Sequence, residues 1–211
     1  EIIARQLDLN LWAYSRVDTI KDEMLDKLRR AGFRWLALGI EAADPAVRVD
    51  VRKGFDQEGI FRAIEAIHDA GINVIGNYIF GLPEDSLESM QRTLDLAQSL
   101  NCEFANFYCA MAYPGSQLHR RAQASGWPLP KTWGGYSQHA ADTLPLPTRY
   151  LTSTEVLRFR DQAFQKYFTD EKYLGMIERK FGPKTVEQIN AITAVRLTRR
   201  EASEEATCAY S

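Results

Sequence analysis

Polar or turn-forming residues follow four short apolar runs of this chain, and their types suit the binding of a polar organic molecule. In chain order these positions are Ser15, Arg16 and Asp18, then Glu41, then Asn77 and Gly81–Glu84, then Tyr113–Ser116. Glu41 stands out because a carboxylate accepts strong hydrogen bonds from ligand amino and hydroxyl groups. Gly81 would let a ligand approach the backbone closely.

Each of these positions also has a plain structural explanation, and the residues alone leave both explanations open. Glu41 could be a surface residue that begins a loop. Gly81 with Pro83 could form an ordinary strand-to-helix turn, which needs both residue types. Arg16 and Asp18 could pair with each other, and Pro114–Gly115 reads as a turn.

The histidines and cysteines give no metal-binding pattern. Cys102 and Cys109 are seven residues apart, and neither His119 nor His139 has a suitably spaced partner. We expect His68 on the solvent side of a helix and Cys109 as a small packing residue in a strand.

The elements that must position these residues follow a repeating strand-then-helix pattern. Apolar runs predict strands over residues 7–14, 33–40, 72–80 and 103–111. Thr19 with Asp22, and Asp85 with Glu88, predict helix N-termini after two of them. Strands that begin about 30 to 40 residues apart suit parallel pairing through helical crossovers, so we expect an α/β fold. Ligands of such sheets bind at the carboxyl ends of the strands.

The pattern changes after residue 124. Four prolines and a Gly-Gly pair make 125–149 a long loop, which carries Trp127, Trp133, Tyr136 and His139. Helices are predicted after the capping pair Thr152 and Glu155, over 172–181 and over 184–199, and the last dozen residues are expected to fray. We place a boundary near Pro147, between a core of residues 1–147 and a helical extension of residues 148–211.

Composition narrows the class of protein. The 211 residues are 45% hydrophobic, with a net charge of -2 and three cysteines. This excludes a disordered acidic chain, gives no support to nucleic-acid binding, and does not fit a secreted disulfide framework. No apolar run approaches the roughly 20 residues of a membrane span, so we expect a cytoplasmic location.

Taken together, the strand ends resemble the radical S-adenosylmethionine (SAM) superfamily over roughly residues 9–120. The similar runs occur in order: 39–42 (GIEA), 52–54 (RKG), 71–84 (GINVIGNYIFGLPE) and 113–116 (YPGS). The resemblance implies a partial (β/α)6 TIM-like barrel, of which this chain would form the C-terminal portion, with a C-terminal helical extension.

The resemblance also assigns SAM-binding roles, residue by residue. Glu41 matches a strand-end glutamate near the ribose and methionine parts of SAM, and Ile79 matches an isoleucine that packs against adenine. Gly81 matches the second glycine of the same motif, and Asn77 stands where the first glycine is usual, beside Gly76. Arg16 matches a recurrent arginine of less certain role.

The sequence departs from the family in one major respect. Members hold a 4Fe–4S cluster through a CxxxCxxC loop after the first strand, and this chain has none. The early Gly-Gly-Glu strand is missing as well. We therefore expect a fragment whose first two βα units precede Glu1 and which is inactive by itself; a natural homologue without the cluster is the alternative.

The resemblance implies a function for the intact protein. It would use the cluster to cleave SAM reductively and abstract hydrogen from an unknown substrate, or methylate or rearrange it, with an electron donor such as flavodoxin or ferredoxin. Residues 151–168 are similar to helices of members that carry a cobalamin-binding domain, which makes cobalamin a further expected cofactor. The alternatives are a non-catalytic adaptor and an unrelated TIM-barrel lyase or aldolase.

Overall fold

The fold is built on a parallel sheet of four strands, as the sequence predicts. A computed structural model describes residues 1–48 and 56–200, so the run 52–54 and the expected frayed tail lie outside the described residues. The strands are β1 (Leu11–Arg16), β2 (Phe33–Glu41), β3 (Asn73–Phe80) and β4 (Phe104–Cys109). They pair in the order β1-β2-β3-β4, and every pairing is parallel.

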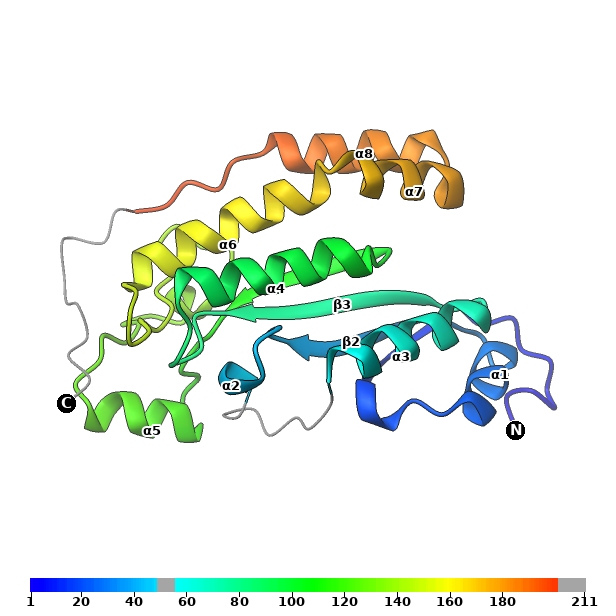
Figure 1. Ribbon diagram of the computed structural model, residues 1–211, viewed down its shortest axis with the longest axis horizontal. Helices are drawn as coiled ribbons and strands as arrows, with labels where there is room; N and C mark the ends of the chain where they lie inside the picture. Colours follow the sequence, from blue (N-terminus) through cyan, green and yellow to red (C-terminus); the bar gives the residue numbers. More distant parts are fainter. Residues whose placement is uncertain (49–55, 201–211) are drawn as a thin grey trace.

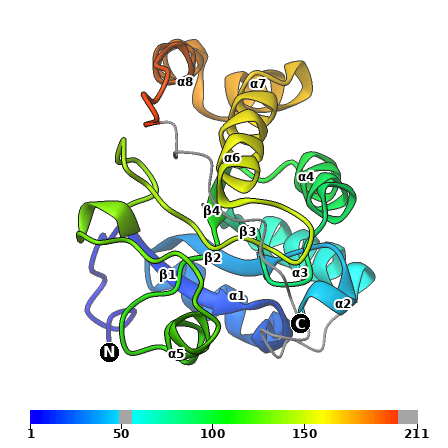
Figure 2. The same cartoon turned by 90° about the vertical axis from the view of Figure 1, so that its left-hand side faces the viewer.

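Helices cover one face and one edge of this sheet. Figure 1 shows α1 (Asp22–Arg30), α3 (Gln57–Asp69) and α4 (Leu87–Leu100) in front of the strands. The helices α6 (Ser153–Phe168), α7 (Glu171–Phe181) and α8 (Pro183–Ala194) follow the edge beyond β4 (Figures 1 and 2). Shorter helices, α2 (Pro45–Arg48) and α5 (Gln117–Ala124), lie toward the carboxyl ends of the strands, and the 3-10 turns are Val17–Thr19 and Gly134–Tyr136.

The core lies between the sheet and these helices. Side chains of a strand alternate between its two faces, and Leu38, Ile40 and Phe80 point toward the helices, where each is fully buried. Helix α6 joins the same core, because Phe159 packs edge-on against Phe80 at 5.0 Å between ring centroids. The helical extension therefore packs directly on the sheet.

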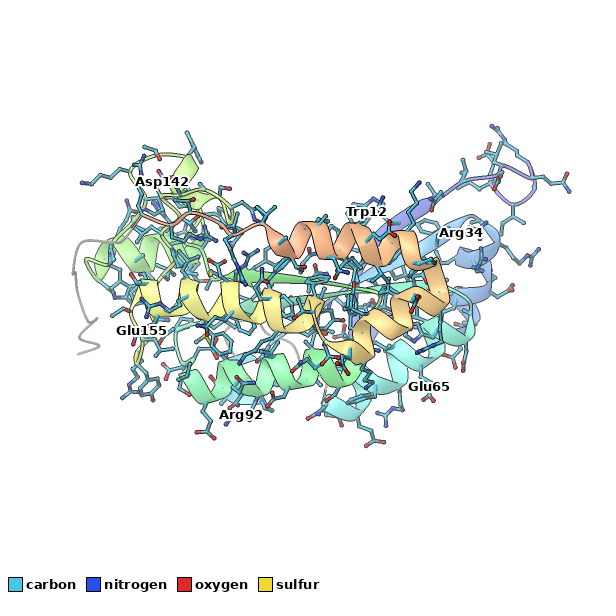
Figure 3. All side chains as sticks on the ribbon, turned by 90° about the horizontal axis from the view of Figure 1, so that it is seen from above. Trp12, Arg34, Glu65, Arg92, Asp142 and Glu155 are labelled. Atoms are coloured by element: carbon cyan, nitrogen blue, oxygen red, sulfur yellow. The ribbon has the colours of Figure 1, made fainter. Side chains whose placement is uncertain are left out.

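The opposite face of the sheet, which we call the open face, carries exposed aromatic residues. Trp12 and Tyr14 of β1 are 55% and 68% exposed, and Phe104 of β4 is 41% exposed. Seen from above, Trp12 lies on one side of the sheet, and Glu65 of α3 and Arg92 of α4 lie on the other (Figure 3). Half of a barrel would leave its inner surface uncovered in this way.

Two of the predicted helix caps are wrong in detail. Helix α1 begins after Lys21, and Thr19 instead donates to the carbonyl of Arg16 at 2.9 Å. Helix α4 is capped by a reciprocal pair of Ser86 and Ser89 rather than by Asp85 and Glu88. The predicted cap of α6 by Thr152 and Glu155 is confirmed.

The expectation of a solvent-facing His68 holds only in part, because its side chain is 33% exposed and its imidazole reaches a buried carboxylate. Its Nε2 lies 3.1 Å from Oε2 of Glu103, which also accepts the Val74 N–H at 2.7 Å and a hydrogen bond from Lys180 of α7. Burial alone would raise the pKa of Glu103, but these hydrogen bonds outweigh it and lower the pKa to about 2. The buried carboxylate thus joins α3, β3 and α7 at the amino-terminal end of the sheet.

The described residues contain no helix long and apolar enough to cross a membrane.

Candidate functional site

Glu41 ends β2 in a strained backbone conformation that turns the chain out of the sheet. Its φ is 68°, in the left-handed region that residues other than glycine seldom adopt. The Ala42 N–H donates to the Ile40 carbonyl at 3.1 Å, which closes a three-residue turn around Glu41, and the pairing with β3 shifts register between Gly39 and Glu41. Strain of this kind persists where the surrounding structure holds it, often at functional sites.

Asn77 lies on the open face, one strand away from Glu41, and is held on both sides. Its Nδ2 donates to the Leu38 carbonyl of β2 at 3.1 Å, and its Oδ1 accepts from Nδ2 of Asn106 in β4 at 2.9 Å. The register places Gly39, Asn77 and Asn106 in one row across the sheet. The adjacent Gly76 faces the helices, where the Tyr78 hydroxyl would lie 2.7 Å from an added Cβ, so close packing requires glycine there.

Arg16 extends this row onto β1, and Ile79 lies one step further toward the carboxyl edge. Arg16 pairs with Gly39 across β1 and β2, and its guanidinium binds Asp18 through two hydrogen bonds of 2.9 and 2.6 Å. The ion pair that the sequence left open is therefore present. Ile79 packs against a small apolar cluster that includes Ala42 and Leu82.

Close packing around position 81 requires a glycine there. Its φ is +80°, and an added Cβ would lie 2.4 Å from Cγ1 of Val156 in α6. The Gly81 and Leu82 N–H groups donate to Oδ2 of Asp85 at 3.0 and 3.1 Å, so this chain's own carboxylate occupies both backbone donors. Burial raises the pKa of Asp85 to about 6, against the lowering effect of these hydrogen bonds.

Sequence reasoning missed two residues of β4 that face the site. Asn106 fixes the amide of Asn77, and Tyr108 lies one strand step further toward the carboxyl edge, opposite Ile79. Burial, and to a smaller extent the charges of Tyr14, Tyr113 and Glu41, raise the pKa of Tyr108, while Arg160 lowers it. The alternation of Phe104, Asn106 and Tyr108 on one face was the available signal.

A cavity of about 410 Å³ opens on the same face, on the amino-terminal side of Asn77. Aromatic and aliphatic side chains form most of its wall, and Asn106 supplies a polar group. The lining includes Trp12, Tyr14, Trp35, Ile75, Phe104 and Asn106. Such a mixture of apolar walls and few polar groups is typical of small-molecule sites.

Other candidate positions have structural roles. The turn Tyr113–Ser116 is closed by a 3.0 Å hydrogen bond from the Ser116 N–H to the Tyr113 carbonyl, and Ser116 caps α5. Trp127 is buried in a small cluster under the long loop, and Trp133 is 79% exposed.

The described residues do not fit a 4Fe–4S cluster. Cys102 and Cys109 are both buried, and burial raises the pKa of each thiol to about 12, which disfavours the thiolate that iron requires. Within residues 1–48 and 56–200, no three His, Cys, Asp or Glu side chains gather as a metal site would require. The packing role predicted for Cys109 agrees with its burial.

Fold and site together define a partial parallel α/β barrel with polar residues at the carboxyl ends of its strands. Residues 9–97, from the approach to β1 into α4, match the family model described as the radical SAM superfamily. This match favours the radical SAM superfamily over the alternative of an unrelated barrel lyase or aldolase.

Two relatives match longer stretches of the chain. The chain is 26% identical over 168 residues to an uncharacterized methyltransferase of Pyrococcus horikoshii, which covers 80% of the chain and 36% of that protein. It is 32% identical over 121 residues to the anaerobic magnesium-protoporphyrin IX monomethyl ester cyclase of Rubrivivax gelatinosus, covering 56% of the chain and 22% of the relative. The chain thus spans well under half the length of both proteins.

A solved structure confirms the predicted fold class. Coproporphyrinogen III oxidase (HemN) of Escherichia coli, a radical SAM enzyme, superposes with a TM-score of 0.52 at 22% sequence identity. The match covers 80% of this chain and 37% of the oxidase. The sheet and its helices thus match a partial TIM-like barrel of the kind found in this enzyme.

Proposed function

We propose that this chain is the SAM-holding portion of a radical SAM enzyme, with SAM bound at the carboxyl edge of β2 and β3. The observation that carries the proposal is the strained turn at Glu41, which sets a carboxylate at the end of β2, next to the strand that carries Asn77 and Ile79. An acidic group there can accept hydrogen bonds from the SAM amino group or ribose hydroxyls. Ile79 supplies an apolar side chain for adenine.

Arg16 and Gly81 take secondary parts in this proposal. Arg16 would meet SAM as one member of its pair with Asp18, since both guanidinium contacts are already directed there. Gly81 permits the close approach of α6 to the end of β3, which shapes the wall of the site.

The cavity on the open face supports a planar, largely apolar substrate. Trp12, Tyr14 and Trp35 provide aromatic surface, and Asn106 can orient a polar substituent. The name of the Rubrivivax relative refers to a magnesium porphyrin ester, a molecule of this shape and polarity. We propose this class of substrate for the whole protein.

The cofactors proposed for the whole protein follow from the match to the superfamily model. The superfamily uses SAM with a 4Fe–4S cluster, which supplies the electron that cleaves SAM. Because the described residues do not fit the cluster, its ligands belong elsewhere in the proposed whole protein. Cobalamin, an electron donor such as flavodoxin or ferredoxin, and a cytoplasmic location remain parts of the proposal.

Reductive cleavage of SAM tests the proposed function. The whole protein, reconstituted with iron and sulfide and reduced with dithionite, should convert SAM to methionine and 5′-deoxyadenosine, measured by chromatography. A cluster-loaded protein that forms no 5′-deoxyadenosine, with or without added cobalamin and substrate, would instead favour the non-catalytic adaptor.

A further inference from the structure

A second cleft lies apart from the open face, between α6 and the chain that follows α8. After α8 ends at Ala194, residues 195–200 run back along α6 toward its amino-terminal half (Figure 1). The cleft between them has a volume of about 410 Å³, within the range of small-ligand sites.

The lining of this cleft is strongly basic in a protein whose overall net charge is -2. Five of its side chains are cationic and one, Asp161, is anionic. The cationic residues are Arg158, Lys166, Arg196, Arg199 and Arg200.

Arg199 and the carboxylate of Asp161 are bound to each other and to neighbouring parts of the fold. Arg199 donates to both oxygens of Asp161, each at 2.9 Å, and to the carbonyls of Ala140 and Gln138 at 2.8 and 3.0 Å. Asp161 also accepts from Arg160 at 2.9 Å. These bonds fasten residues 138–140 of the long loop to α6 and neutralise Asp161.

The other four cationic side chains are not held by ion pairs of this kind within the described residues. Arg158, Lys166, Arg196 and Arg200 are exposed, and none forms an ion pair within 4.0 Å among residues 1–48 and 56–200. Arg158 acts on Glu155 of its own helix only at longer range. Four cations facing one cleft repel each other, and an anionic ligand would relieve that repulsion.

The spacing of these cations indicates the kind of anion. Arg158 and Lys166 are eight residues apart on α6, about 12 Å along its axis. Arg196 and Arg200 are four residues apart on the opposite wall, at most about 14 Å. Three of the four are arginines, whose planar forks bind phosphate oxygens in pairs. Leu144, Pro145 and Leu157 add apolar surface for an organic group.

We propose that this cleft binds a small organic diphosphate, at a site distinct from the proposed SAM site. The diphosphate lies between the two cationic walls, and the organic part rests on the apolar floor. The diphosphate site does not involve radical chemistry, so its test is independent of the proposed function.

Calorimetric titration of the full chain at low ionic strength tests the proposal, with ADP, inorganic pyrophosphate and adenosine as probes. ADP and pyrophosphate should bind, and adenosine should bind at least tenfold more weakly than ADP. Saturating SAM should leave the ADP affinity unchanged. Added salt should weaken ADP binding, because exposed charges are screened.

The double variant Arg196→Gln/Arg200→Gln should weaken ADP binding at least tenfold and keep the parent's thermal unfolding temperature, since Arg199 is left intact. A matched control, Arg30→Gln/Arg62→Gln, removes two exposed arginines from α1 and α3 and should change the affinity less than twofold. ADP binding that is absent, unaffected by the first variant or lost on adding SAM overturns the proposal. So does binding of a single-stranded RNA by a chain that does not bind ADP.

Discussion

Glu41 is the residue on which the proposed SAM site depends most. A carboxylate at the end of a buried strand can be accidental, but a left-handed backbone at a residue other than glycine costs about 1 to 3 kcal/mol. Glu41 has this unfavourable backbone conformation, and the turn that it forms directs the chain out of the sheet. A binding role for the side chain would explain why glycine does not occupy this position.

Replacing Glu41 by glutamine should weaken SAM binding to the whole protein at least tenfold. The change removes the charge and leaves the shape, and a hydrogen bond to a charged group contributes about 1.5 to 3 kcal/mol. Equilibrium dialysis with labelled SAM measures the effect. Glu65→Gln on the outer surface of α3 is the control and should bind as the parent does; equal affinity of the Glu41→Gln variant removes the role assigned to Glu41.

At the scale of elements, the approach of α6 to the end of β3 depends on Gly81. Alanine at this position should destabilise the protein by roughly 2 to 5 kcal/mol, because backbone strain adds to a clash with Val156. Gly115 has a similar φ of +84° but open space around it. Gly115→Ala should therefore lower the free energy of unfolding by only about 1 to 2 kcal/mol. Denaturant unfolding measures both, and equal losses would show that the clash is relieved at no cost.

The contact of α7 with the sheet should depend on pH through Glu103. Its pKa is lowered from the ordinary 4.5 to about 2 in the folded state, so the stabilisation is complete above pH 4.5 and is lost as the pH falls toward 2. A shift of this size corresponds to roughly 3 kcal/mol.

Unfolding free energies of the parent and of Glu103→Gln, measured between pH 6 and pH 3, test this dependence. The parent should lose more stability than the variant over that range, and the variant should be less stable at pH 6 because His68 and Lys180 lose their carboxylate partner. Parallel pH profiles for the two proteins would contradict the assignment.

The strands and most helices were predictable because buried apolar runs and capping pairs are local signals. The contacts that shape the site are different. Asn77 and Asn106 meet from positions 29 residues apart, and His68 meets Glu103 across 35 residues. The left-handed turn at Glu41 is formed by a residue other than glycine, so the sequence gives no local signal for it. Such features depend on how the strands are placed side by side, which no short segment of sequence encodes.

At the scale of the molecule, the sheet has two unlike faces. Helices bury one face in the main core, and the other presents Trp12, Tyr14 and the cavity beside Asn106. In a radical SAM barrel, the corresponding surface would enclose the reaction, and the strand ends would hold SAM. The proposed site therefore predicts which segments of this chain SAM protects, and not only that SAM binds.

Hydrogen–deuterium exchange of the whole protein with and without SAM tests that claim most directly. Peptides covering residues 38–44 and 76–82 should exchange more slowly when SAM is bound, because ligand contacts hold the turn at Glu41 and the end of β3. Peptides from residues 60–68 of α3 should not change. SAM-dependent protection that leaves 38–44 and 76–82 unaffected would contradict the proposed site.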